Sequence, residues 1–186
     1  MRLFYAVEIP EDIRHKLTRE IEVLEDYPLK FAHHYQYHIT LLFIGEVEPK
    51  NVKFLNTAIE KNTFHKFHIS LEGMGVFSDK DGAVKVIYKG IGEGTRELTA
   101  IHDYLAMRCG ESLSNKNRRV YEPHLTLARG LVKGNGINDT IREEVRVISE
   151  KNRIYRFNVR EIVLVNSTLS SKGSEYKVVG KLLLSQ

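Results

Sequence analysis

The chain has 186 residues, 42% of them hydrophobic and 28% charged, and a formal net charge of +4 with a sequence pI near 9.1. This length suits one compact domain or two intimately packed lobes with a core of their own, and the composition excludes a disordered or fibrous protein. No run of about eighteen apolar residues occurs and the N-terminus lacks an apolar leader, so neither a membrane span nor secretion is expected.

The cysteine count and the charge bear on compartment and partner. Cys109 is the single cysteine, which excludes an intramolecular disulfide and suits a reducing cytoplasm. The positive charge favours a polyanionic partner, because Lys and Arg attract phosphates and release their counterions. Many basic proteins bind no nucleic acid, so the charge supports an RNA partner only together with a motif.

The first part of the chain predicts alternating strands and helices. A strand is expected over 2–9, and Pro10 with two acidic residues after it marks a helix whose apolar face recurs as far as Leu24. The segment 38–44 is predicted to be a strand, and Pro49 opens a second helix. The pattern is therefore strand, helix, strand, helix.

The rest of the chain repeats this mixture. Strands over 67–71 and 83–88 are expected to join through an Asp-Gly turn. Phosphate-loop spacing is absent from a set of glycines that we expect in turns, namely Gly73, Gly75, Gly90, Gly92 and Gly94. The remaining predicted elements are a helix over 97–107, a strand over 123–128, a helix over 140–148 and strands over 155–165 and 176–184. No Gly/Ser linker separates the halves, so we expect one bilobal α+β domain over 1–186.

One four-residue motif occurs twice. Residues 38–41 read His-Ile-Thr-Leu and residues 124–127 read His-Leu-Thr-Leu. A single His-x-Thr is expected roughly 0.4 times by chance in such a composition, whereas the longer form is expected on the order of a hundredth of a time. Its duplication in matching contexts makes coincidence a poor explanation.

The motif has the chemistry of a phosphate site. Side chains alternate along a strand, so His38 and Thr40 are expected on one face, and His124 and Thr126 likewise, with the apolar partners toward the core. Imidazole, with an unperturbed pKa of about 6.5, serves as acid or base, and hydroxyls donate hydrogen bonds to phosphate oxygens. Two such strands lining one groove would suit in-line phosphoryl transfer.

The sequence resembles the two-histidine (2H) phosphoesterase superfamily and, within it, the RNA 2′,3′-cyclic phosphodiesterases once named 2′-5′ RNA ligases. The resemblance covers essentially the whole chain and is carried by residues 2–7, 38–47 and 122–129. It implies two pseudo-symmetric lobes whose antiparallel sheets line a central groove, with helices outside. It also implies hydrolysis of RNA 2′,3′-cyclic phosphate ends to 2′-phosphates, without cofactor or metal, with ligation as a secondary activity.

Carried over by position, the resemblance implies catalytic His38 and His124, and substrate binding by Thr40, Thr126 and Arg129. Arg129 has the opposite strand parity to Thr126, so it reaches the groove only if the strand ends or twists after the motif. We expect His124 to activate water and His38 to protonate the departing 3′ oxygen. The expected partner is RNA with cyclic phosphate ends, tRNA fragments included, bound by a cytoplasmic monomer.

Several alternatives stay open. Either motif histidine taken alone fits a satisfied residue at a sheet edge, and the remaining six histidines are assigned no catalytic role. His34 and His38 have a zinc-ligand spacing but lack an adjacent Glu and a helical context. Phe43 is a tempting base-stacking residue, yet its odd offset from His38 predicts the core face. Arg118 and Arg119 either steer an RNA backbone or form a solvated turn.

Two other functions are consistent with the same motifs. One is a module that clamps an RNA terminal phosphate without cutting it. The other is a phosphoesterase or ligase acting on a different substrate, such as a cyclic phosphate of ADP-ribose or a 2′-5′ linked oligonucleotide. The motifs define the phosphate chemistry but not the base or length preference.

Overall fold

A computed structural model describes residues 1–60, 64–109, 120–130, 135–170 and 173–186, so Arg118 and Arg119 lie outside the described residues. Its strands are β1 Arg2–Glu8, β2 Leu29–Phe31, β3 His38–Glu46, β4 Phe67–Ser78, β5 Val84–Ile91, β6 Leu125–Gly130, β7 Tyr155–Val159, β8 Glu161–Ser170 and β9 Gly173–Leu183. Its helices are α1 Glu11–Glu20, α2 Val52–Glu60, α3 Thr95–Cys109 and α4 Asn135–Glu150, with 3-10 turns η1 Glu22–Leu24, η2 His34–Gln36 and η3 Pro49–Asn51.

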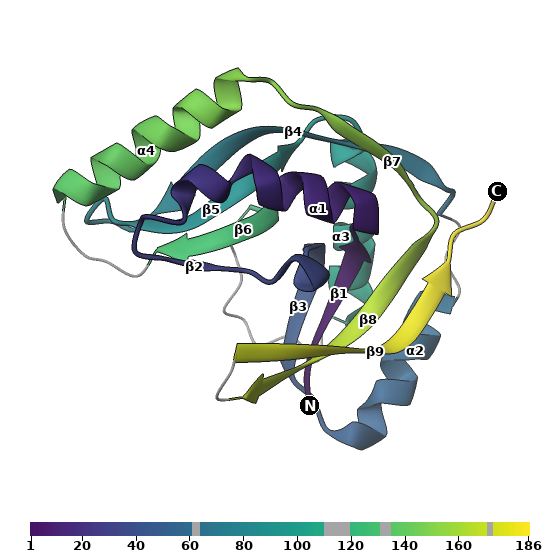
Figure 1. Cartoon of the computed structure of the whole chain (residues 1–186). Helices are drawn as coiled ribbons and strands as arrows, with labels where there is room; N and C mark the ends of the chain where they lie inside the picture. Colours follow the sequence, from purple (N-terminus) through teal and green to yellow (C-terminus); the bar gives the residue numbers. More distant parts are fainter. Residues whose placement is uncertain (61–63, 110–119, 131–134, 171–172) are drawn as a thin grey trace.

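All the strands join one antiparallel sheet in the order β7-β4-β5-β6-β3-β1-β8-β9, with β2 attached to β6 (Figure 1). The sheet has two halves, which meet where β3 pairs with β6. Within the described residues this junction has one ladder pair, Ile39 with Leu125. Beyond it β3 diverges, and β2 continues along the same edge of β6. The prediction of an α+β fold is confirmed.

Helices cover one face of the sheet. Two of them, α1 and α3, pack against the half of the sheet that does not contain the strand preceding them in the chain. α1 follows β1 in the chain, yet it lies with α4 over β4, β5 and β6 (Figure 1). An ion pair ties it there: Lys89 Nζ on β5 lies 2.7 Å from Glu20 Oε1 on α1, and both side chains are 1% exposed. In the other direction α3 packs against β3. Each half of the sheet is therefore covered partly by a helix that follows, in the chain, a strand of the other half.

The apolar side chains of the helices explain this packing. The buried helical residues recur at intervals of three or four, which places them on one side of each helix. They are Ile13 and Leu17 of α1, Leu98, Ile101 and Leu105 of α3, and Ile141, Val145 and Ile148 of α4. A smaller buried cluster lies on the opposite face of the sheet and consists of Phe4, Ala6, Val163 and Val165.

Two predictions about the strands are wrong. The expected strand over 155–165 is two strands, since β7 pairs with β4 in one half and β8 with β1 in the other, with Arg160 between them. The apolar pattern of 155–165 carries no sign of this change of partners. Gly73 and Gly75 lie inside β4, and Gly90 lies inside β5, rather than in turns. Strand glycines often mark a close approach of neighbouring groups, and Gly75 does so beside the motifs.

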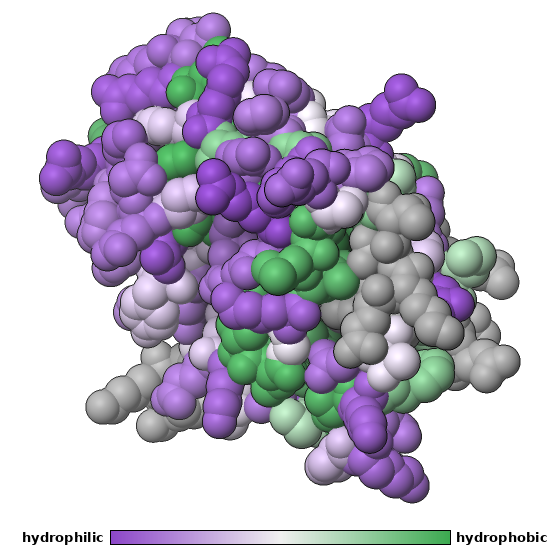
Figure 2. All heavy atoms as spheres, turned by 90° about the vertical axis from the view of Figure 1, so that its right-hand side faces the viewer, coloured by the Kyte–Doolittle hydropathy of each residue, from purple (hydrophilic) through white to green (hydrophobic). Residues whose placement is uncertain are grey.

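Apolar side chains are exposed among polar ones on one side of the molecule. Figure 2 shows the side of the molecule that is on the right in Figure 1, where hydrophobic side chains gather in the middle of the face. Exposed large hydrophobic residues on α2, α3 and β9 include Phe54, Met107 and Leu183. No helix in the described part of the chain combines the length and apolar character needed to cross a membrane.

Candidate active site

The two motifs lie side by side at the junction of the sheet halves. The ladder joins β3 and β6 at Ile39 and Leu125. Because the strands are antiparallel, the residues flanking this pair match crosswise, the histidine of each motif beside the threonine of the other. The four predicted side chains that are brought together are His38, Thr40, His124 and Thr126. We call the side of the sheet that carries them the motif face.

Both imidazoles are oriented by the same kind of hydrogen bond. Nδ1 of His38 lies 2.6 Å from the carbonyl oxygen of Gln36, and Nδ1 of His124 lies 2.7 Å from that of Glu122. A carbonyl oxygen only accepts, so Nδ1 carries the proton and, in the neutral ring, Nε2 is the acceptor. Thr40 Oγ1 lies 3.1 Å from Nε2 of His38 and donates to it. Each motif therefore offers a basic Nε2 nitrogen.

His38 is enclosed by two aromatic rings. Its ring centroid lies 4.9 Å from that of Phe4 on β1 and 5.4 Å from that of Tyr176 on β9. The two aromatic rings also contact each other edge to face, at 5.3 Å. A ring packed on two sides has little rotational freedom, so Nε2 of His38 has a fixed direction.

The surroundings of His38 change its acidity. Burial foremost lowers the pKa of His38, and the hydrogen bond to the Gln36 carbonyl opposes this. The charges of His124 and Arg129 lower the pKa of His38 further. Both of these groups therefore lie close enough to act on the first motif, which joins the two motifs in one electrostatic site.

His124 has an equivalent aromatic enclosure from the other half of the sheet. Its ring lies 4.9 Å from that of Phe77 on β4 and 5.6 Å from that of Tyr88 on β5, and those two rings stack at 4.4 Å. The ring of Tyr88 occupies the space over Gly75, where an added Cβ would lie 2.6 Å from its Cζ atom. The glycine lets Tyr88 lie flat against β4 and contact the histidine.

A β-bulge follows the first motif and overturns one prediction. The ladder with β1 includes Thr40 and then Leu42, and it skips Leu41. One extra residue reverses the alternation of side chains, so Phe43 lies on the motif face, opposite Phe4. Phe43 was predicted to face the core, and that prediction is wrong because it assumed an uninterrupted strand. Its side chain is 37% exposed.

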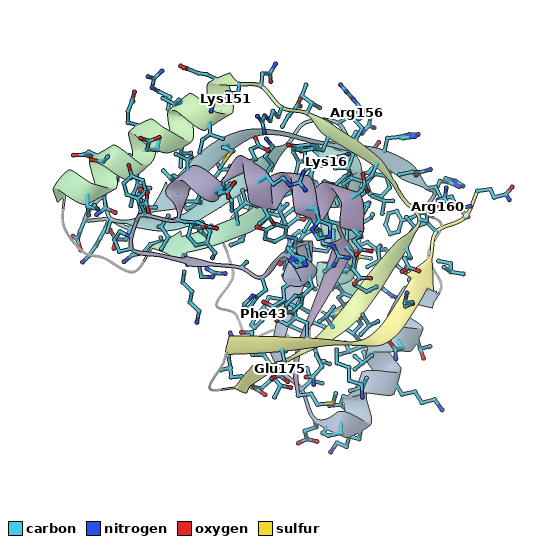
Figure 3. The ribbon with its side chains drawn as sticks, viewed as in Figure 1. Lys16, Phe43, Lys151, Arg156, Arg160 and Glu175 are labelled. Atoms are coloured by element: carbon cyan, nitrogen blue, oxygen red, sulfur yellow. The ribbon has the colours of Figure 1, made fainter. Side chains whose placement is uncertain are left out.

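Phe43 also carries a cation on its ring. The guanidinium carbon of Arg2 lies 5.0 Å from the ring centroid, which is within the range of a cation–π contact. Arg2 and Phe43 belong to neighbouring strands, and both are accessible to solvent. Figure 3 labels Phe43 near β3, below the labels of Arg156 and Arg160.

A second bulge follows the second motif at the same position. The ladder with β5 includes Thr126 and then Ala128, and it skips Leu127. This shift turns Arg129 toward the motif face, against the parity of a regular strand. Its charge reaches His38, as the lowered pKa of that histidine shows. Phe43 and Arg129, each five residues after a motif histidine, therefore take equivalent places.

Four residues of the site had not been expected. They are the aromatic residues around the histidines, Phe4, Tyr176, Phe77 and Tyr88. Each lies on a strand other than that of its histidine, so only the sheet order brings them together. Nothing local in the sequence of β5 relates Tyr88 to His124.

The zinc alternative finds no support in the arrangement of its two histidines. His34 belongs to η2, and its ring lies 5.0 Å from that of His15. His38 begins β3 and is enclosed by Phe4 and Tyr176. The spacing that would align two ligands on a helix is therefore not helical here. Across the part of the chain that is described, no three His, Cys, Asp or Glu side chains gather in a metal-binding arrangement.

Proteins similar to this chain along nearly its whole length are known. An RNA 2′,3′-cyclic phosphodiesterase of Archaeoglobus fulgidus is 31% identical over 181 residues, which cover 95% of this chain and 97% of the relative. The family model described as "LigT like Phosphoesterase" matches residues 7–88, which include the first motif. The chain belongs to the LigT-like phosphoesterases. The prediction of a 2H phosphoesterase, a hydrolase acting on phosphoric diesters, is thereby confirmed.

Solved structures agree with the fold of this LigT-like phosphoesterase. A protein of Thermus thermophilus covers 99% of the chain, and the chain covers 98% of it, with a TM-score of 0.80 at 24% identity. LigT of E. coli in complex with 3′-AMP covers 100% of the chain, which covers 98% of it, with a TM-score of 0.79 at 21% identity. At these identities the likeness shows the fold alone, and it confirms the predicted 2H phosphoesterase fold.

Proposed function

We propose that this LigT-like phosphoesterase hydrolyses 2′,3′-cyclic phosphates at RNA ends to 2′-phosphates by acid–base catalysis between His38 and His124. The observation that carries the proposal is the paired orientation of the imidazoles, each with Nδ1 bonded to a carbonyl and Nε2 available. In-line displacement needs one group to activate water and another to protonate the departing oxygen. The relatives named RNA 2′,3′-cyclic phosphodiesterase support the substrate class.

The phosphate is bound by the other side chains of the motif face. Thr40 and Thr126 donate hydrogen bonds to the non-bridging oxygens, and Arg129 adds a charge-assisted contact. The hydroxyl of Thr40 donates to Nε2 of His38 in the free protein and turns to the phosphate when the substrate binds. These contacts strengthen as negative charge accumulates on the phosphorus oxygens during the reaction.

The nucleoside lies against the exposed ring of Phe43. Aromatic rings stack the bases of single-stranded RNA, and the cation–π contact with Arg2 holds the Phe43 ring in position. The partly exposed ring of Tyr176 lies against His38 and against the buried ring of Phe4. The base-stacking alternative, set aside on strand parity alone, is favoured once the bulge places Phe43 on the motif face.

The environment of His38 favours an order of proton transfer opposite to the one expected from the sequence. Burial lowers the pKa of His38, so its ring is neutral at pH 7 and serves as the base that activates water. The acid that protonates the 3′ oxygen is then His124. Water adds to phosphorus and gives a proton to His38, while the bond from phosphorus to the 3′ oxygen breaks and His124 gives its proton to that oxygen. The products are a 2′-phosphate and a 3′-hydroxyl.

This order predicts how the pH profile responds to Arg129→Gln. A base acts when deprotonated, so kcat/KM rises with pH through the pKa of His38, which lies below the ordinary value of histidine. The charge of Arg129 lowers that pKa, and its removal should move the acidic limb of the profile to higher pH. The measurement is kcat/KM against pH for a cyclic nucleotide, scored by the position of the limb.

Lys30→Gln is the matched control for this prediction. Lys30 is the ladder partner of Arg129 on β2, but it is not among the charges that act on His38. Its removal should leave the acidic limb in place. If Arg129→Gln shifts the alkaline limb instead, His38 is the acid, and if neither limb moves, the electrostatic account of His38 is wrong.

Product analysis tests the reaction itself. An oligonucleotide with a 2′,3′-cyclic phosphate end is incubated in excess chelator, and the 2′- and 3′-phosphate products are separated. We expect turnover to a 2′-phosphate, and an added 5′-hydroxyl oligonucleotide reports any secondary 2′-5′ ligation. A 3′-phosphate product would reverse which oxygen leaves. Binding of the end without any product would favour the non-catalytic clamp.

The same proposal extends to the working unit. We propose that residues 1–186 form one bilobal unit, because the site takes one histidine from each half of a continuous sheet. We propose that it acts as a monomer on RNA ends, tRNA fragments among them, since one chain supplies all the proposed site residues.

A further inference from the structure

Two side chains donate hydrogen bonds to backbone carbonyls of the first motif. The hydroxyl of Tyr121 donates to the carbonyl oxygen of Thr40 at 3.0 Å, and Nδ1 of His102 donates to that of Leu41 at 2.7 Å. Their rings stack in parallel, with centroids 4.0 Å apart and an interplanar angle of 0°. They therefore act on consecutive carbonyls as one stacked pair.

These two carbonyls belong to the bulge of β3. A bulge interrupts the ladder and leaves one residue without a strand partner, here Leu41. A buried carbonyl without a donor destabilises the conformation, so a bulge inside a protein needs another donor. Burial also raises the pKa of Tyr121, which keeps its hydroxyl protonated as a donor throughout the working range.

The equivalent bulge in the other half is stabilised in a different way. There the carbonyl of Leu127 accepts a hydrogen bond from the backbone N–H of Ala32, at 2.9 Å, in the segment that follows β2. Main chain thus supports the second bulge. In the first half the side chains of His102 and Tyr121 supply the hydrogen bonds that the backbone of Ala32 supplies in the other.

The pair also spans the junction between the motifs. Within the described residues β3 and β6 share one ladder pair, so the ladder alone fixes little of their separation. Tyr121 lies three residues before His124, and Pro123 between them restricts the backbone. The bond from Tyr121 to the Thr40 carbonyl therefore ties the approach to the second histidine to the backbone of the first motif.

We propose that Tyr121 and His102 are positioning residues that fix the Thr40–Leu41 bulge and thereby the separation of the two motif histidines. Neither side chain is placed at the reacting phosphate. They act through Thr40 and through the segment that leads to His124. The inference rests on the proposed function, because it assigns these two residues a part in the same site.

Tyr121→Phe is the first test, since it keeps the stacked ring and removes only the donor. Misplacement of reacting groups by about 1 Å lowers rates up to about 100-fold, so we expect kcat for a cyclic nucleotide to fall about 10- to 100-fold with KM nearly unchanged. The matched control is Tyr27→Phe, which removes a hydroxyl bonded to Glu144 at 3.5 Å, outside the site. Its kcat should equal that of the wild type.

His102 allows a rescue experiment. His102→Phe keeps a ring for stacking but removes the donor to Leu41, and it should lower kcat like Tyr121→Phe. His102→Asn restores an N–H near the position of Nδ1 and should recover most of the loss. In a His124→Ala background, Tyr121→Phe should lower the rate little further, because the group that it positions is already absent.

An activity-independent measurement separates this inference from the proposed function. The imidazole NMR signals of His38 and His124 should shift in Tyr121→Phe and stay in place in Tyr27→Phe. If they do not move, the positioning role is overturned whatever the activity. If the signals move and kcat falls, the positioning role is supported. If the wild type turns over cyclic phosphate but Tyr121→Phe is equally fast, the positioning role is overturned and the proposed function stays intact. A wild type without turnover contradicts the proposed function, and the NMR shifts then test by themselves whether Tyr121 positions the two histidines.

Discussion

Replacing His124 with alanine is expected to lower kcat for a 2′,3′-cyclic nucleotide by about 10²- to 10⁴-fold, and His38→Ala should have an effect of the same size. Each change removes one of the two Nε2 groups that the Gln36 and Glu122 carbonyls orient. The measurement is the initial rate at saturating substrate in excess chelator.

The pattern among variants is as informative as the size of the loss. Two groups that act in one step contribute jointly, so the double variant should be little slower than either single one. His65→Ala is the control, because His65 is exposed and bonds to the carbonyl of Gln186 rather than to the motif face. If either motif histidine can be removed with a near-normal rate, acid–base catalysis by the pair is excluded.

The second large effect concerns folding. Lys89→Ala is expected to lower the free energy of unfolding by about 3–5 kcal/mol, because it leaves the carboxylate of Glu20 in the core without its partner. Oε2 of Glu20 has no hydrogen bond in the structure, so the ion pair through Oε1 is the main compensation of the buried carboxylate charge. Urea denaturation at neutral pH gives the difference in unfolding free energy.

Two comparisons separate the buried pair from an ordinary one. Lys89→Met combined with Glu20→Leu removes both charges at similar volume and should recover most or all of the lost stability. Lys181→Ala breaks the exposed contact with Glu161, also at 2.7 Å, and should change stability by about 0–1 kcal/mol. A Lys89→Ala variant no less stable than Lys181→Ala would contradict the assignment.

The sequence predicted which motif side chains come together better than it predicted the course of the strands that carry them. The duplicated His-x-Thr-Leu motif and its strand context were sufficient to select His38 and His124, and the structure brings their strands together. Parity along a strand was the wrong guide beyond the motif, because each motif ends in a bulge. A bulge depends on the partner strand, which a local pattern does not include.

Arg129 and Phe43, the residues after the two bulges, show why strand parity alone was insufficient. Arg129 was assigned to the site by resemblance although parity opposed it, and Phe43 was assigned to the core because parity favoured it. The same physical cause, one extra residue in the ladder, places both on the motif face. The aromatic enclosures and the His102–Tyr121 pair come from distant strands and a distant helix, so they needed the sheet order.

At Arg160 the chain passes from one half of the sheet to the other, and this affects when β1 can complete its pairing during synthesis. β1, the first strand of the chain, obtains its outer neighbour only from β8, through pairs such as Ala6 with Val163. During synthesis β1 must therefore wait until β8, about 155 residues later in the chain, has left the ribosome. Such distant pairings slow folding and leave an edge unprotected meanwhile. A chain interrupted before residue 161 would keep both histidines and still lack the strand that completes the half containing His38.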